Sequence, residues 1–252
     1  MARRIVDAGF DLVLWARRPE SLEPYRDTAA SVAESVADLG RQVDYCGVCV
    51  VDDAGVTEVV EQLLTSMQSG SVIVIHSTVT PKLCIELAAR AAHAGIDLLD
   101  APVSGGGPGA AAGTLTVMIG GKKTAAARVQ SVLDTFAGSV SYLGDVGAGQ
   151  YAKLVNNTMM AANLATANYA IEVAAELGIE LNAFKELVKQ SSGRSFAFDV
   201  RARMNAPKDF AHGAKLLAKD VGLLGESLTD DSQSYEAIAG MAKTFLEVAL
   251  GE

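Results

Sequence analysis

Lys153 and Asn157 are the two residues whose types and spacing best suit catalysis. They lie in the run Gly147-Ala-Gly-Gln-Tyr-Ala-Lys-Leu-Val-Asn-Asn157, and no Gly or Pro interrupts the chain from Gln150 to Leu177. That uninterrupted stretch predicts a helix about 40 Å long at a rise of 1.5 Å per residue. Residues four apart share one face of a helix, so the amine and the amide point the same way. Such a pair suits proton exchange with an alcohol oxygen that the amide holds in place.

The position of Lys153 near the start of this helix predicts a lowered pKa. Unpaired N–H groups and the helix dipole place partial positive charge at a helix N-terminus. That field and burial both penalise an ammonium group. A lysine that points into solvent is the alternative interpretation, because lysines are rarely fully buried.

A second candidate site is the segment Asp100-Ala-Pro-Val-Ser104-Gly105-Gly106, which follows a predicted strand. Ligands bind at the carboxyl ends of parallel strands. A serine followed by two glycines suits a turn that aims successive N–H groups at one carboxylate. An ordinary glycine-rich turn is the alternative.

Strands and helices alternate in the first part of the chain. We expect strands at Phe10–Trp15, Val43–Val51, Ser71–Ile75, Ile96–Val103, Thr114–Ile119 and Val140–Leu143. Helices are expected over residues 1–8, 54–67, 81–94 and 122–136, whereas residues 19–42 show no clear helix. This alternation predicts an α/β fold with a Rossmann-like, doubly wound parallel sheet.

The second part of the chain reads as helices alone, over residues 150–177, 182–190, 196–204, 211–228 and 235–249. We therefore predict a dinucleotide-binding α/β domain over residues 1–146 and an all-helical substrate and dimerisation domain over residues 147–252. The long helix carries small or apolar residues on nearly every side. Such a helix is buried in a core or against another subunit, so a homodimer or tetramer is expected.

Composition excludes several classes of protein. The net charge of −9 over 252 residues argues against nucleic acid as a partner. No apolar run is long enough to cross a bilayer and no signal peptide opens the sequence, so we expect no membrane partner and a cytoplasmic location.

The three cysteines are Cys46, Cys49 and Cys84. The first two have C-x-x-C spacing but fall in a predicted strand, where residues three apart face opposite ways. Buried, reduced thiols are expected, and we expect no metal site.

These motifs together resemble the 3-hydroxyacid dehydrogenase family, which includes 3-hydroxyisobutyrate dehydrogenase, tartronate semialdehyde reductase and the glyoxylate/succinic semialdehyde reductases. The matching segments follow one another through nearly the whole chain. They are Ser77-Thr78-Val79 with Pro81, Asp100–Gly106 with Gly113–Thr116, Gly147–Asn157, and Lys219-Asp220.

The resemblance implies hydride transfer between a nicotinamide cofactor and a small 3-hydroxy acid or semialdehyde. It implies that Lys153 is the general acid and base and that Asn157, with Asn156, orients the substrate. It also implies that Ser104, Gly105 and Gly106 bind the substrate carboxylate.

The resemblance further implies cofactor contacts at Val50, Val51, Thr78 and Lys219. The strand that meets the adenosine ribose normally ends in an acid when NAD is the cofactor. Here Arg17 and Arg18 follow that strand, and two guanidinium groups suit a 2′-phosphate. We therefore expect NADP in preference to NAD.

The family opens with a strand and a Gly-x-Gly-x-x-Gly turn that holds the pyrophosphate. Met1–Ile5 matches the middle of the helix after that turn, so we expect the strand and the turn to lie upstream of Met1. Either the start codon is assigned at an internal Met, or the product is truncated. A truncated or silent homologue that acts as a dimeric scaffold without cofactor is one alternative. An imine reductase is another, but those relatives usually replace the lysine.

Overall fold

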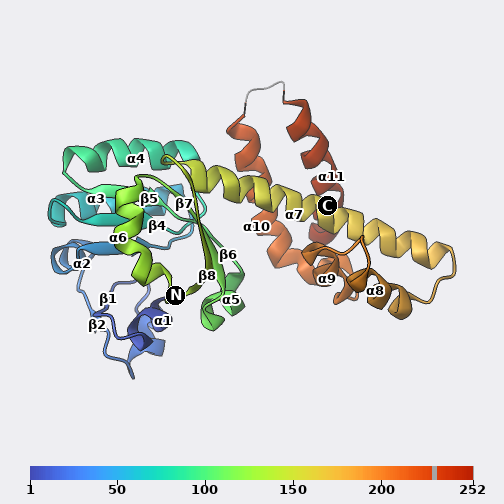
Figure 1. Ribbon diagram of the computed structural model, residues 1–252, viewed down its shortest axis with the longest axis horizontal. Coiled ribbons are helices and arrows are strands. Elements are labelled where there is room, and N and C mark those ends of the chain that lie inside the picture. Colours follow the sequence, from blue (N-terminus) through green and yellow to red (C-terminus); the bar gives the residue numbers. More distant parts are fainter. Residues whose placement is uncertain (229–231, 252) are drawn as a thin grey trace. The chain divides into compact units, whose positions relative to one another are not determined.

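The computed structural model describes residues 1–228 and 232–251, and the chain forms two units, Met1–Lys153 and Leu154–Glu252 (Figure 1). The division falls inside the long helix α7 (Ala148–Glu176). The boundary that we predict from the sequence, between residues 146 and 147, lies just before this helix and stays a prediction. Each unit is described by itself.

A six-stranded sheet forms the centre of the α/β unit, with β3 (Tyr45–Val48), β4 (Val72–Ile75) and β5 (Asp97–Asp100) running parallel. Beyond them, β7 (Leu115–Gly120) is antiparallel to β5 and to β6 (Val103–Ser104), and β8 (Ala137–Gly144) is parallel to β7. The Rossmann-like fold class is confirmed, but the sheet that we expected to be parallel is mixed.

Pro102 explains part of that difference. We predicted one strand over Ile96–Val103, whereas the structure has β5 ending at Asp100 and β6 beginning at Val103. Proline has no N–H to donate to a ladder, so it interrupts a central strand. The chain turns there, and β6 pairs with β7 in the antiparallel direction.

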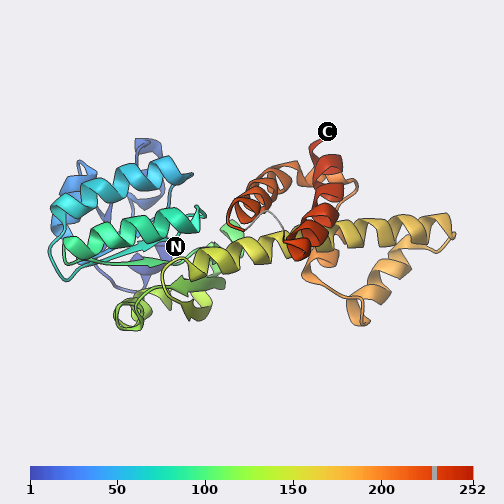
Figure 2. The ribbon, with the colours of Figure 1, turned by 90° about the horizontal axis from the view of Figure 1, so that it is seen from above.

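The strand β4 shows how the sheet is covered on both faces. Ile73 and Ile75 pack in one core with α2 (Val36–Gln42), α3 (Asp53–Ser66) and α4 (Pro81–His93). Val72 and Val74 pack in a second core with α6 (Lys123–Leu133). Successive side chains of a strand point to opposite faces, so this wholly apolar strand requires helices on both sides. Figure 2 shows α3 and α4 side by side over the sheet.

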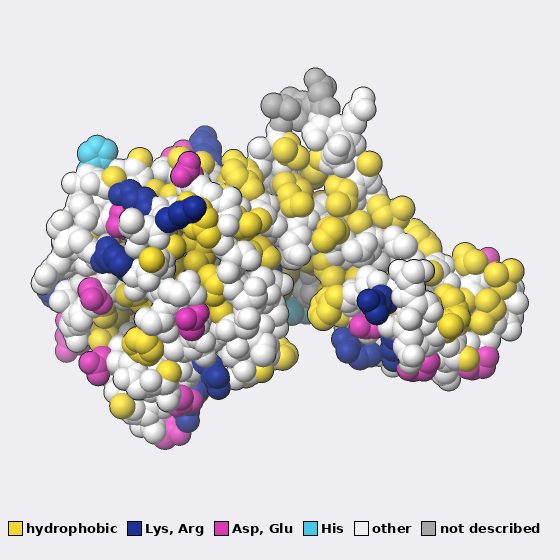
Figure 3. Space-filling view, viewed as in Figure 1, with side chains coloured by type: hydrophobic (Ala, Val, Ile, Leu, Met, Phe, Trp, Pro, Cys, Tyr) yellow, Lys and Arg dark blue, Asp and Glu magenta, His cyan; other side chains and the backbone are white. Residues whose placement is uncertain are grey.

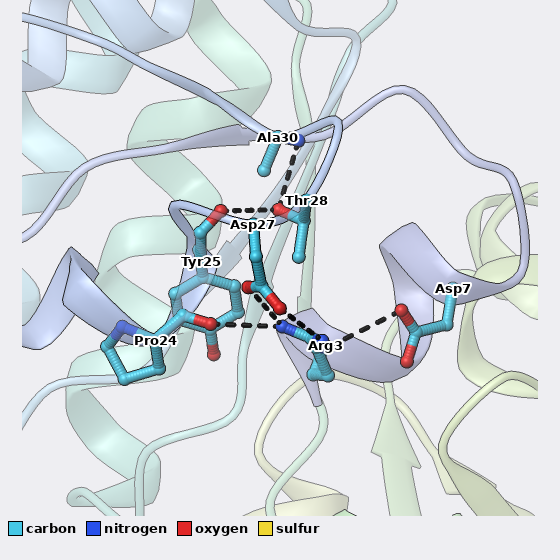
Figure 4. Close-up of polar contacts among 7 residues, drawn as sticks. All are labelled: Arg3, Asp7, Pro24, Tyr25, Asp27, Thr28 and Ala30. Carbon is cyan, nitrogen blue, oxygen red and sulfur yellow. Dashed lines mark hydrogen bonds and ion pairs between the residues drawn. The ribbon is translucent and has the colours of Figure 1, made fainter.

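The first residues form α1 (Ala2–Asp7), as predicted, and β1 (Val13–Leu14) pairs with β2 (Ser31–Val32) in a separate two-stranded sheet. Arg3 joins α1 to the segment after the 3₁₀ helix η1 (Pro19–Tyr25). Its guanidinium donates to both carboxylate oxygens of Asp27, at 2.9 and 3.1 Å, and to the Pro24 carbonyl (Figure 4). This pair is exposed, so it adds little stability.

The helix α2 lies in the stretch where we expected no helix. Ser35 begins it, because its side chain accepts the Asp38 N–H and the Asp38 carboxylate accepts the Glu34 N–H. This reciprocal arrangement resembles a capping box. The Ser-x-x-Asp spacing is therefore the signal that predicts the helix.

The helical unit contains most of α7 and the helices α8 (Leu181–Gln190), α9 (Phe196–Ala202), α10 (Ala211–Glu226) and α11 (Gln233–Leu250), with a 3₁₀ turn at Pro207–Phe210. Its core combines Leu and Phe with many alanines, and Ala161, Ala165, Ala214 and Ala242 are fully buried. The described residues of this unit contain no strand, as predicted. Within the described ranges, no helix has the length and hydropathy of a membrane span.

Candidate functional site

The three parallel strands end together at one edge of the sheet. Val48, Ile75 and Asp100 are aligned in register at the last positions of β3, β4 and β5. The loops that follow are joined, because the Val50 N–H donates to Ser77 Oγ at 2.8 Å. This edge therefore brings together the segments that contain Val50, Val51 and Thr78, which we predict to contact the cofactor.

Asp100 anchors the start of α7 to this edge. Its carboxylate is fully buried and accepts the Gly147 N–H at 2.7 Å and the Gln150 N–H at 2.8 Å. Burial raises the pKa of Asp100, while these backbone hydrogen bonds oppose the rise. Asp100 thus caps a helix far along the chain, a role that our sequence analysis missed. An acid at the end of the buried Leu98-Leu99 strand is the signal.

Gly149 lets the first turn of α7 approach the sheet. A Cβ at this position would lie 2.3 Å from the Met118 carbonyl oxygen and 2.9 Å from Asp100 Oδ2. Only glycine avoids both contacts. The second glycine of the Gly-x-Gly motif is therefore required by packing rather than by an unusual backbone angle.

Lys153 follows in the next turn of the same helix and is 8% exposed. Burial excludes the interpretation of Lys153 as a solvent-exposed lysine. The Asp100 carboxylate lies at this helix start, so its negative charge opposes the helix dipole on which we based a lowered pKa for Lys153. That lowered pKa stays a prediction.

Asn157 lies one turn further along α7 and is held by a buried acid. Its Nδ2 donates to Asp220 Oδ2 at 2.5 Å, and the Asn156 Nδ2 donates to Asn157 Oδ1 at 3.2 Å. Asp220 is buried on α10 beside the exposed Lys219. The structure gives Asp220 a specific task, which is to orient the Asn157 amide.

Ser104, Gly105 and Gly106 lie where β6 passes into α5 (Gly106–Ala112), a helix that we did not predict. Gly105 has φ +123° and Gly106 has φ +61°, in the region that favours glycine. Both glycines are exposed and Ser104 is half-buried. The conformation confirms a tight turn, and its role in binding a carboxylate stays a prediction.

Arg17 and Arg18 follow β1 and are exposed. Arg17 pairs with Glu58 on α3, with 2.6 Å between Arg17 Nη2 and Glu58 Oε2. A phosphate at this position would therefore compete with a carboxylate for Arg17.

His76 is a buried, packed histidine. Its Nδ1 is 2.8 Å from the Ala101 carbonyl and its Nε2 is 3.3 Å from the Tyr45 hydroxyl. The acceptor at Nδ1 fixes the proton there, so Nε2 accepts from Tyr45. Burial is the main cause that lowers the pKa of His76 to about 4.

The three cysteines are free thiols. Cys46 and Cys84 are buried as expected, and burial raises the pKa of Cys46 to about 12. The expectation of burial is wrong for Cys49, which is exposed because β3 ends at Val48 and Cys49 lies in the loop. Among the described residues, no group of three His, Cys, Asp or Glu side chains is placed to hold a metal ion.

Two family models match the chain in succession. The NAD binding domain of 6-phosphogluconate dehydrogenase matches residues 1–144, and the NAD-binding domain of NADP-dependent 3-hydroxyisobutyrate dehydrogenase matches residues 147–249. Together they describe an NAD(P)-binding protein, and the first alone matches more than half of the chain.

Relatives and solved structures agree with these matches. The chain is 37% identical over 182 residues to 2-(hydroxymethyl)glutarate dehydrogenase of Eubacterium barkeri, an alignment that covers 69% of this chain and 60% of that relative. The structure resembles 3-hydroxyisobutyrate dehydrogenase of Mycobacterium tuberculosis with L-serine, with TM-score 0.85, 25% identity, and coverage of 98% of this chain and 90% of that one. It also resembles Psf3 in complex with NADP+ and 2-OPP, with TM-score 0.82, 26% identity, and coverage of 97% and 88%.

The matched family models span both units, over residues 1–144 and 147–249, and the named relatives and solved structures include hydroxyacid dehydrogenases. The chain belongs to the 3-hydroxyacid dehydrogenase family.

Proposed function

We propose that this protein is an oxidoreductase that transfers a hydride between NADP(H) or NAD(H) and a small 3-hydroxy acid or its semialdehyde. The observation that carries the proposal is the buried amine of Lys153 one helical turn before Asn157, whose amide is held by Asp220. Membership of the family supports the same reaction.

The proton follows a simple path in this proposal. Lys153 donates a proton to the carbonyl oxygen during reduction and takes one from the alcohol during oxidation. The Asn157 Nδ2 carries two hydrogens, and one is donated to Asp220. We assign the second to the substrate oxygen. A bound nicotinamide would supply the hydride for reduction or accept it in oxidation.

The substrate carboxylate is assigned to Ser104, Gly105 and Gly106, with Asn156 as a further contact. The two glycine backbones lack a Cβ, so an anion can approach them closely. A carboxylate held there fixes one end of the substrate, which orients the other end for reaction.

The residues at the sheet edge fit a dinucleotide cofactor. Val50, Val51 and Thr78 follow the aligned ends of β3 and β4, and ligands commonly bind at the carboxyl ends of parallel strands, which supports assigning these residues to the cofactor. Lys219 is assigned as a further contact. Arg17 and Arg18 are assigned to a 2′-phosphate, so NADP is the preferred cofactor.

The proposal is tested with the chain itself, by titration with NADPH and NADH followed by assay of a panel of short semialdehydes. We expect micromolar binding of NADPH and oxidation of NADPH by at least one semialdehyde that carries a carboxylate. The matched neutral aldehyde of the same length should react more slowly, because it lacks the group that the Ser-Gly-Gly turn binds. Binding of NADPH without turnover of any substrate, or no binding, contradicts the proposal and favours the alternative of a truncated or silent homologue.

We also propose that the protein forms a homodimer or tetramer, and its cytoplasmic location stays part of this proposal. One side of the helix α7 exposes the apolar residues Val155, Met159, Tyr169 and Val173, and Leu177 directly after the helix is also exposed. Of the two expected ways to bury this helix, this side leaves burial against another subunit. Figure 3 shows hydrophobic side chains over much of the visible face of the helical unit. Such patches mark protein interfaces. Sedimentation velocity should give at least a dimer, and a monomer at all concentrations contradicts this.

A further inference from the structure

Gln150 is a polar residue with no exposed surface in the first turn of α7. Its side-chain Nε2 donates to the Ser77 carbonyl at 2.8 Å, and its Oε1 accepts the Val79 N–H at 3.3 Å. The two bonds hold the loop after β4 on both sides of Thr78. A buried amide is costly without partners, and here both ends of the amide have one.

The contacts of Gln150 extend through the whole edge of the sheet. Its backbone N–H donates to Asp100 at the end of β5, and Ser77 accepts the Val50 N–H from the loop after β3. A continuous set of hydrogen bonds therefore joins the three loops to the first turn of one helix. Lys153 lies three residues after Gln150, which is about 4.5 Å along the axis. Any displacement of Gln150 relative to the loop therefore moves Lys153 relative to Thr78.

We propose that Gln150 is a positioning residue that sets the distance between the proton-transferring amine of Lys153 and the loop around Thr78. The proposal rests on the proposed function, in which this loop contacts the cofactor. Gln150 touches neither substrate nor cofactor in this scheme and acts through the backbone of residues 77 and 79. Proton and hydride must reach one carbonyl group together, and a misplacement of about 1 Å is enough to lower a rate about 100-fold.

The chemistry of the site selects glutamine. The Ser77 carbonyl requires a donor and the Val79 N–H requires an acceptor, and a neutral amide of this length supplies both. An ionised glutamate supplies acceptors only and would face the Ser77 carbonyl with a negative charge. A protonated glutamate supplies one donor and one acceptor, so it can restore the pattern.

The test compares Gln150→Glu and Gln150→Met with the wild type. We expect Gln150→Met to lower kcat about 10- to 100-fold while KM for the semialdehyde changes less than about threefold. Gln150→Glu should lose kcat as pH rises and its buried carboxyl ionises, and recover part of it as pH falls, because the protonated carboxyl donates to Ser77 again. Gln42→Glu, at an exposed glutamine of α2, is the matched control and should leave kcat unchanged.

A positioning role predicts that kcat recovers in Gln150→Glu at low pH while KM for the semialdehyde stays nearly constant, a split that a general loss of folded protein would not produce. Wild-type kcat in Gln150→Met, or a loss in Gln150→Glu that is the same at every pH, overturns the proposal. Amide hydrogen exchange supplies a readout besides activity. The Val79 N–H should exchange faster in Gln150→Met than in the wild type, while the amides of β4 keep their protection.

If the wild type is active and the Val79 N–H exchanges at the same rate in Gln150→Met as in the wild type, the positioning role is contradicted and the proposed function is not. Absence of turnover in the wild type contradicts the proposed function and the positioning role with it. The two failures are therefore distinguishable.

Discussion

The buried acids Asp100 and Asp220 accept different kinds of hydrogen bond at the helix α7. Asp100, in the α/β unit, accepts hydrogen bonds from backbone N–H groups at the start of α7. Asp220, in the helical unit, accepts one from the side chain of Asn157. The first kind of contact fixes the course of the chain, whereas the second fixes the direction of one amide. We therefore expect changes around Asp100 to lower stability and changes at Asp220 to lower activity.

The largest effect on stability is expected at Gly149, where the backbone of α7 meets the sheet. Gly149→Ala would place a Cβ 2.3 Å from the Met118 carbonyl oxygen, so the helix start must move. We expect a loss of at least about 3 kcal/mol in the free energy of unfolding, measured with urea. Gly240→Ala in α11 is the control, because its Cβ would meet nothing within 4 Å. That variant should gain up to about 1 kcal/mol, and an equal loss in both variants would contradict this account of Gly149.

Asp100→Ala is expected to lower the free energy of unfolding by roughly 2 to 6 kcal/mol. The change leaves the buried N–H groups of Gly147 and Gln150 without their acceptor, at about 1 to 3 kcal/mol each. The control is Asp52→Ala, which removes an exposed cap of α3 that bonds the Gly55 N–H and should cost about 1 kcal/mol. Equal losses of unfolding free energy in the two variants would show that the burial of Asp100 does not add to its contribution to stability.

The pH dependence of stability is expected to depend on His76. Burial lowers the pKa of His76 from 6.5 to about 4, so the unfolded chain binds its proton first as pH falls. Folded stability is therefore lost between pH 6.5 and 4, by up to about 3 kcal/mol from this residue. The raised pKa of Asp100 increases folded stability as pH falls, but this contribution is common to all the variants compared.

His76→Asn should reduce this loss, because its amide can still donate to the Ala101 carbonyl but does not titrate. His93→Asn, at an exposed histidine, should leave the loss unchanged. Urea unfolding at a series of pH values measures both. Parallel curves for His76→Asn and the wild type would refute the prediction.

Asp220→Ala is expected to lower activity more than stability, in contrast to Asp100→Ala. Without its acceptor, the Asn157 amide turns more freely, so we expect kcat to fall about 10- to 100-fold while stability falls by only about 1 kcal/mol. The control is Asp209→Ala, because Asp209 is an acid of the helical unit that bonds the backbone N–H groups of Asn205 and Ala206. That variant should lose stability and keep kcat. Equal kcat values for the two variants would contradict the assigned role of Asp220.

Much of the fold follows from local patterns in the sequence. The alternation of apolar segments with Pro- or Gly-bounded helices predicts α4, whose first residue is Pro81, and β4, which is wholly apolar. The direction of β6 and the break at Pro102 depend on partners far along the chain, so local patterns do not reveal them. The short helix α5 is rich in glycine, which has a low helix propensity, and it forms in the tertiary context.

The candidate site also contains residues that local spacing reveals and partners that it does not reveal. Lys153 and Asn157 are found from their spacing on one helix, since residues four apart share a face. Spacing does not reveal the acids that hold the helix start and the Asn157 amide. Asp100 lies 47 residues before its partner Gly147, and Asp220 lies 63 residues after its partner Asn157. Only the folded chain shows which of many acids and amides meet.

The central claim is that Lys153 transfers the proton, and Lys153→Met tests it most directly. Methionine fills a similar volume but has no proton to give. We expect kcat for semialdehyde reduction to fall about 10²- to 10⁴-fold while the dissociation constant for NADPH stays within about threefold of the wild type. Lys243→Met, at an exposed lysine of α11, should retain full activity. A kcat for Lys153→Met within about fivefold of the wild type would contradict the account, because a general acid–base group contributes about 10²- to 10⁴-fold.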